Sequence, residues 1–117
     1  RYEGYEETLS FVEKALELAD GYTEAHKAVA LLGAGWVGEE ALAIALYCAL
    51  KHPNDFRKAL CLSVNHSGDS DSTGAICGNI LGAYLGMEGI PEEWVLRVEL
   101  SDVIIRMAEE LYSSRRA

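Results

Sequence analysis

The sequence is poor in proline, in positive charge and in apolar/polar alternation, and each shortage argues against a class of protein. Only 2 of its 117 residues are proline, and no segment alternates in the way that a half-buried strand requires. Lysine and arginine together number 10 against 19 aspartates and glutamates, so the formal net charge is −9. That balance argues against nucleic acid and anionic membrane surfaces as partners.

Long apolar runs are missing too, and cysteines are few. No stretch is long enough to span a bilayer, so we expect a cytoplasmic protein without a membrane partner. The cysteines, Cys48, Cys61 and Cys77, are odd in number and lack the spacing of a zinc site. Each lies in an apolar helical pattern, which favours reduced structural thiols.

What the sequence does contain is helical periodicity. Half of its residues are hydrophobic and a quarter are charged, as is ordinary for one globular domain. Apolar residues recur at helical spacing in residues 8–20, 23–32, 39–51, 54–64, 72–85 and 101–112, and a short helix is expected after Pro91. The sequence therefore predicts a single all-α domain over residues 1–117. The segment 39–51 is apolar on nearly every side, which predicts burial.

Small residues recur every four positions in two of these segments. The two stripes are Ala41, Ala45 and Ala49 in one and Gly74, Gly78, Gly82 and Gly86 in the other. An interior glycine costs a helix roughly 0.5–1 kcal/mol against alanine, so a stripe of them needs a compensating contact. We expect the segments 39–51 and 72–85 to cross closely along these stripes.

The aromatic residues have ordinary packing interpretations. We interpret Tyr47 and Tyr84 as core residues and Trp94 as a residue packed beneath the last helices. Two interpretations stay open for Trp36, which either flanks a ligand or lies in the core.

Residues 65–74 place two aspartates, Asp69 and Asp71, among hydroxyl side chains directly before an apolar segment. Carboxylates in such a place are costly unless something pairs with them. Oxygen ligands suit hard cations such as Mg²⁺, Mn²⁺ or Ca²⁺. We therefore expect a divalent-metal site at Asp69, Asp71 and a neighbouring hydroxyl. An EF-hand loop is excluded because its twelfth position falls on Ile80, and a dehalogenase-type phosphatase would require a preceding buried strand.

Four motifs follow one another along the chain, at residues 35–45, 65–78, 81–86 and 90–94. Together they resemble the C-terminal part of the ADP-ribosylglycohydrolase family. The resemblance implies an orthogonally packed multi-helix fold, of which residues 1–117 would be the C-terminal half, and a two-metal centre holding Mg²⁺ or Mn²⁺. It also implies hydrolysis of the bond between ADP-ribose and a protein side chain, or of a related ADP-ribose conjugate.

The resemblance also implies site residues. The family's Gly-Asp-x-Asp-Thr/Ser motif would make Asp69, Asp71 and Ser72 the metal ligands, with Asp71 bridging. Two loops would line the ADP-ribose pocket, with Gly35, Trp36 and Val37 in one and His66, Ser67 and Gly68 in the other. For His66, a structural hydrogen bond within the loop is an equal alternative. No catalytic residue is assigned.

One part of the family pattern has no counterpart in this sequence. Relatives carry a Thr/Ser-Asp-Asp cluster and a further acidic residue near their N-terminus, which nothing in residues 1–51 matches. The acidic pairs at 6–7 and 39–40 are interpreted as capping or solvated residues. We therefore expect a C-terminal fragment that is inactive alone, exposes apolar faces and self-associates. The alternative is a non-catalytic helical module that acts through binding or assembly.

Overall fold

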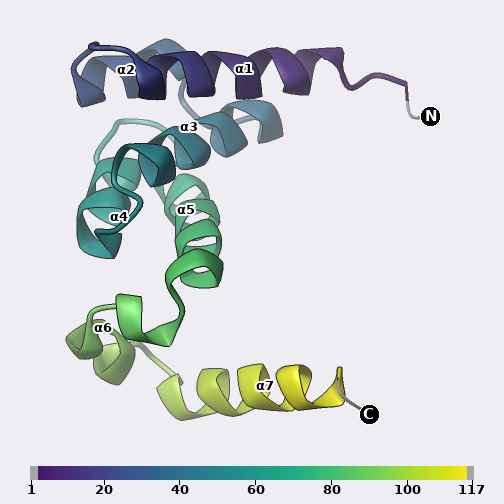
Figure 1. The fold of residues 1–117 in the computed structure, drawn as a ribbon, viewed down its shortest axis with the longest axis vertical. Coiled ribbons are helices and arrows are strands. Elements are labelled where there is room, and N and C mark those ends of the chain that lie inside the picture. Colours follow the sequence, from purple (N-terminus) through teal and green to yellow (C-terminus); the bar gives the residue numbers. More distant parts are fainter. Residues whose placement is uncertain (1–2, 116–117) are drawn as a thin grey trace.

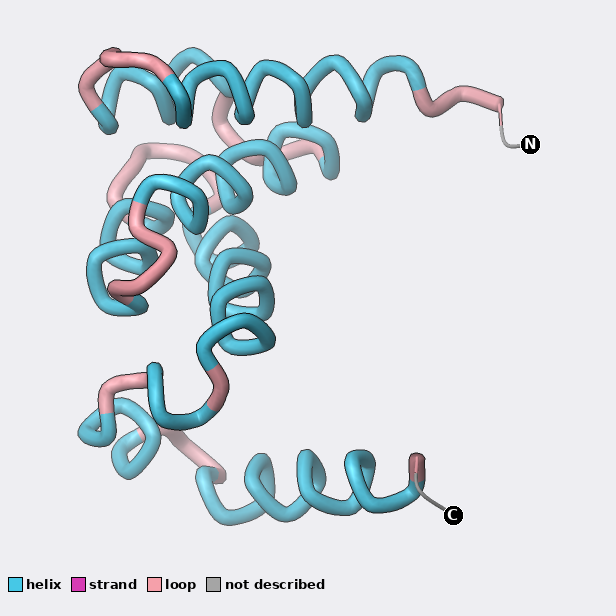
Figure 2. Tube along the Cα trace, viewed as in Figure 1, coloured by secondary structure: helices cyan, strands magenta, loops and turns pink. Residues whose placement is uncertain are grey.

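A computed structural model of the protein describes residues 3–115, and within that range every regular element is a helix (Figure 1). The elements in chain order are α1 (Glu6–Asp20), α2 (Ala25–Leu32), α3 (Gly38–Lys51), α4 (Phe56–Val64), α5 (Ser70–Leu85), the 3₁₀ turn η1 (Met87–Gly89), α6 (Glu92–Arg97) and α7 (Ser101–Ser114). Figure 2 shows that only short loops join them. The prediction of an all-α fold is confirmed.

Helix α3 forms the centre of the fold. In Figure 1, α1 and α2 lie along one side of α3, whereas α4 and α5 lie on its other side. The buried residues of α3 are Ala41, Ala43, Ile44, Ala45, Tyr47, Cys48 and Ala49. Small side chains predominate among them, which allows neighbouring helices to approach on several sides. The predicted burial of this segment is confirmed.

The glycine stripe of α5 has a different neighbour from the predicted one. Helices α3 and α5 do pack together. A Cβ at Gly74, however, would lie 2.6 Å from Val64 Cγ1, and one at Gly78 would lie 3.7 Å from Leu60 Cδ1. Both neighbours belong to α4, and nothing lies within 4 Å of a Cβ at Gly82. The predicted packing of these two helices is confirmed, but the glycine stripe faces α4, because a four-residue spacing defines a stripe without specifying the helix that covers it.

Helix α6 is fixed to α4 through an aromatic contact. The rings of Phe56 and Trp94 meet edge to face, with centroids 6.1 Å apart. The Arg57 guanidinium lies 4.8 Å from the centre of the Trp94 ring and forms an ion pair with Glu93. Trp94 is a packing residue, as predicted, and its ring contacts with Phe56 and Arg57 join α6 to α4.

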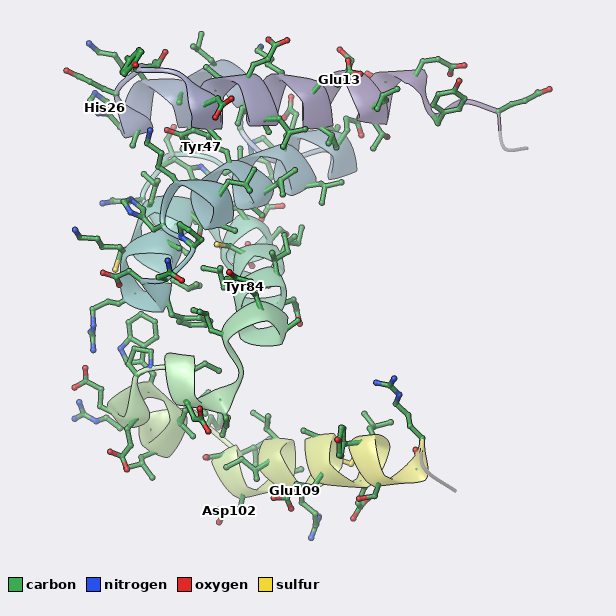
Figure 3. The ribbon with its side chains drawn as sticks, viewed as in Figure 1. Glu13, His26, Tyr47, Tyr84, Asp102 and Glu109 are labelled. Carbon is green, nitrogen blue, oxygen red and sulfur yellow. The ribbon has the colours of Figure 1, made fainter. Side chains whose placement is uncertain are left out.

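Helix α7 extends away from the core and buries none of its residues (Figure 3). One side carries Val103, Ile104, Met107 and Leu111, which are between 41% and 65% exposed. The accessible surface of the protein is 8265 Å², against about 6300 Å² for a compact protein of this mass. The expectation that an apolar face is exposed is therefore met. No helix within residues 3–115 combines the length and the apolarity needed to cross a membrane.

Candidate functional site

The acidic turn is formed at the start of α5, where Asp69 is the N-cap residue. Its Oδ1 accepts a hydrogen bond from the Ser72 backbone N–H at 3.4 Å. Oδ1 of Asp71 accepts from the same N–H at 3.1 Å. Because Asp69 caps the helix, α5 begins two residues before the predicted start at Ser72. A cap at this end is also where the helix dipole favours negative charge.

The side chains of Asp69, Asp71 and Ser72 meet one another. The pKa of the Asp69 carboxyl is lowered, chiefly by a hydrogen bond with the Asp71 side chain and next by the Ser72 hydroxyl. Oδ1 of Asp69 and Oδ1 of Asp71 lie 3.4 Å and 3.1 Å from the Ser72 backbone nitrogen, so the two carboxylates converge on one point. The structure thus brings together the three residues that the sequence proposed as metal ligands, and their oxygen atoms suit Mg²⁺ or Mn²⁺.

The backbone of this turn is held against the loop between α2 and α3. The Asp69 N–H donates to the Ala34 carbonyl at 2.8 Å. Gly68 approaches the same carbonyl so closely that a Cβ there would lie 1.8 Å from the oxygen. Gly35, with φ of +82°, is buried against the turn, and a Cβ on it would lie 3.0 Å from Thr73 Cγ2. Two of the predicted pocket residues, Gly35 and Gly68, therefore flank the acidic turn.

His66 connects this turn to the end of α4. The Gly68 N–H donates to His66 Nδ1 at 3.1 Å, and His66 Nε2 lies 2.9 Å from Thr73 Oγ1. The fully buried Thr73 hydroxyl donates in turn to the Ser63 carbonyl at 2.6 Å. Because Nδ1 accepts a hydrogen bond, a neutral His66 ring carries its proton on Nε2. The structural hydrogen bond considered for His66 is present.

A cleft of about 410 Å³ opens beside the turn. Its lining residues come from α2, from the loop after it and from the loop before α5: His26, Val29, Ala30, Gly33, Ala34, Asn65, His66, Ser67 and Gly68. His66 therefore lines this cleft in addition to forming the structural hydrogen bond. The α2 wall was not foreseen from the sequence. His26, at one end of that wall, has an exposed side chain.

The other predicted pocket residues lie outside this cleft. Trp36 is 70% exposed and Val37 is 48% exposed. The core interpretation of Trp36 is therefore wrong. Tyr47 is fully buried, as predicted, whereas Tyr84 is 69% exposed on α5 and its core assignment is wrong (Figure 3).

The remaining acidic residues do not complete a metal site around the turn. Among residues 3–115, no cluster of three or more histidine, cysteine, aspartate or glutamate side chains is arranged to hold a metal ion. The turn offers two carboxylates and one hydroxyl. These groups lie together at one end of α5.

Sequence comparison now adds to this geometry. The family model for ADP-ribosylglycohydrolase matches residues 1–117. The chain belongs to the ADP-ribosylglycohydrolase family. The resemblance seen in the motifs is thereby confirmed, and the helical architecture agrees with this family. No solved structure gives a significant match.

Three relatives show how much of a family member this chain spans. It is 34% identical over 96 residues to ADP-ribosylhydrolase ARH3 of Mus musculus, covering 73% of this chain and 26% of the relative. It is 39% identical over 64 residues to ADP-ribosylarginine hydrolase Tri1 of Pseudomonas putida, and this match covers 55% of this chain and 17% of the relative. It is 38% identical over 45 residues to the ADP-ribosyl-[dinitrogen reductase] glycohydrolase of Rhodospirillum rubrum, and this match covers 38% of this chain and 15% of the relative. The matched segment spans about a quarter or less of each relative.

Proposed function

We propose that this chain is the C-terminal part of a metal-dependent hydrolase that removes ADP-ribose from modified protein side chains or related conjugates. The observation that supports this most is the meeting of Asp69, Asp71 and Ser72 at the start of α5. Family membership gives that cluster a chemical context, because relatives carry names of ADP-ribosyl hydrolases. The comparisons support the hydrolase class, and the metal dependence is our inference.

Asp69, Asp71 and Ser72 would hold Mg²⁺ or Mn²⁺ through their side-chain oxygens. A bound metal would supply Lewis-acid stabilisation of charge and orientation of a water and of substrate hydroxyls. The chain's contribution is to present these oxygens in one fixed arrangement. The N-terminus of α5 favours the ionised form of Asp69 that metal binding requires.

The cleft beside the turn is the place that we propose for part of ADP-ribose. Its wall carries backbone and side-chain polar groups of Asn65, His66, Ser67 and Gly68. In the neutral His66 ring both nitrogens already have partners within the protein, so the ring serves to shape the wall. Exposed Trp36 lies on the loop next to the turn and offers an aromatic face to a ligand.

Activity requires more than this chain in our proposal. The described residues supply part of a metal ligand set, and the matched segment is 26% or less of each relative described above. We expect the isolated chain to release no ADP-ribose. A second candidate function, a non-catalytic helical module acting through binding or assembly, is favoured by the uncovered apolar side of α7.

Release of ADP-ribose tests the proposal. The assay uses the longest natural polypeptide that contains this segment, with arginine- and serine-linked ADP-ribose conjugates and Mn²⁺ or Mg²⁺. We expect release that chelation abolishes and that Asp71→Asn lowers by at least about 100-fold. Asp102→Asn is the matched control, because Asp102 lies in the first turn of α7, away from the site. Metal-independent release would refute the metal dependence, whereas no release from any conjugate would favour the second candidate.

A further inference from the structure

Beyond the proposed ligands, the loop between α2 and α3 bends around the side chain of Glu40. Gly33 has φ of +113°, and a Cβ there would lie 2.5 Å from Glu40 Cδ. The Gly35 N–H donates to Glu40 Oε1 at 3.1 Å. Glu40 therefore lies inside the bend of residues 33–35 and meets the loop at both of its glycines. Because the acceptor is a carboxylate, this hydrogen bond is stronger than one between neutral groups.

The opposite side of the same bend holds the acidic turn. Ala34, between the two glycines, accepts the Asp69 N–H through its carbonyl at 2.8 Å. The N–H that donates this hydrogen bond belongs to Asp69, which is the N-cap residue of α5 and carries one of the two carboxylates. A displacement of residues 33–35 would therefore be transmitted directly to Asp69. Without the Glu40 carboxylate, the two glycines with positive φ would allow residues 33–35 to adopt many other conformations.

We propose that Glu40 is a positioning residue for the acidic turn: its carboxylate fixes the bend at residues 33–35, and the Ala34 carbonyl in that bend fixes Asp69. The significance for catalysis depends on the metal site of the proposed function, whereas the mechanical link does not. Within residues 3–115 no hydrogen bond or ion pair joins Glu40 to Asp69 or Asp71, so Glu40 acts through the backbone of the loop.

Glu39 provides the matched comparison. It precedes Glu40 in the first turn of α3, has the same charge and is also half-buried. Within residues 3–115, however, Glu39 forms no hydrogen bond or ion pair with the loop. A general effect of acidic charge at the start of α3 would be shared by both residues. Of these two glutamates, only Glu40 is hydrogen-bonded to the loop in the described part of the chain.

Hydrogen exchange of backbone amides, followed by NMR on this chain, tests the link. In Glu40→Ala we expect the Gly35 and Asp69 amides to exchange at least about tenfold faster. Glu40→Gln keeps an oxygen acceptor and should preserve protection to within about threefold. Glu39→Ala should leave both amides unchanged. The His52 amide, bonded to the Cys48 carbonyl at the far end of α3, reports general loss of stability.

The proposal is overturned if Asp69 exchange in Glu40→Ala stays within about twofold of the parent, or if Glu39→Ala accelerates it equally. If Glu40→Ala does not fold, Glu40→Asp replaces it, because it keeps the charge but shortens the reach by one methylene. Unchanged Asp69 protection in that variant would also overturn the proposal. Addition of Mn²⁺ to the unmodified chain reports separately on the proposed function, since the exchange measurements use no metal.

Discussion

Replacement of Gly68 by alanine should separate the acidic turn from the loop that supports it. A Cβ at Gly68 would lie 1.8 Å from the Ala34 oxygen, 2.6 Å from its carbonyl carbon and 2.9 Å from its Cα. All three atoms belong to the backbone, so no side-chain rotation can relieve the overlap. The Cβ–oxygen distance must grow by at least about 1.2 Å to reach a tolerable contact. An equal increase would stretch the 2.8 Å hydrogen bond from Asp69 N–H to Ala34 beyond useful length.

The expected cost follows from these two losses. Overpacking of this kind costs about 1–3 kcal/mol, and loss of a hydrogen bond adds about 1 kcal/mol. We therefore expect Gly68→Ala to lower the free energy of unfolding by about 2–4 kcal/mol, a large part of a domain's usual 5–15 kcal/mol. Urea denaturation followed by circular dichroism at 222 nm measures this difference.

Gly82→Ala is the control for this measurement. Gly82 lies in α5, and a Cβ there would meet nothing within 4 Å. Alanine should therefore stabilise the helix by up to about 1 kcal/mol. If Gly68→Ala were as stable as the parent chain, the close approach of the turn to Ala34 would be wrong. The hydrogen bond from Asp69 to Ala34 would then not be what holds the turn.

Three further predictions concern the rest of the fold. Burial raises the pKa of the Cys48 thiol to about 12 and that of Cys77 to about 11, whereas Cys61 is exposed. A disulfide reagent at pH 8 should therefore modify Cys61 alone until urea is added, and rapid modification of all three would refute their burial. Tyr47 buries a hydroxyl without a hydrogen-bond partner in residues 3–115. Urea unfolding should therefore show Tyr47→Phe to be as stable as the parent chain or more stable by about 1–2 kcal/mol, and a loss of stability would contradict this. In analytical ultracentrifugation the chain should sediment as a dimer or larger assembly that forms through α7, where Ile104 is 52% exposed. Ile104→Glu should make the chain monomeric, and a monomeric parent chain would contradict the expected self-association.

The parts of the structure that depend on local sequence were predictable. Helical periodicity located the helices, and the all-round apolar pattern of α3 indicated its burial. The grouping of acidic residues at this turn could be predicted for the same reason. Asp69, Asp71 and Ser72 lie within one helical turn, so their meeting depends little on the rest of the chain.

Long-range contacts were not predictable from local patterns. Gly68 meets Ala34, which is far away in sequence, and the α2 wall of the cleft forms only when these loops meet. The glycine stripe indicated a close neighbour but not that the neighbour is α4. Tyr84 shows the limit of composition, because an aromatic residue in an apolar helix was expected inside and is 69% exposed. The amphipathic pattern of α7 likewise predicts an apolar side without specifying what covers it.

Paramagnetic broadening by Mn²⁺ is the most direct test of the central claim that the start of α5 binds a divalent cation. Substoichiometric Mn²⁺ is added to the isotope-labelled chain, and amide signals are followed by NMR, which detects even weak binding. We predict that the signals of Asp69, Asp71 and Ser72 broaden first, that Asp71→Asn removes this selectivity and that Asp102→Asn preserves it. Equal broadening at acidic residues throughout the chain, or an unchanged pattern in Asp71→Asn, would contradict the assignment.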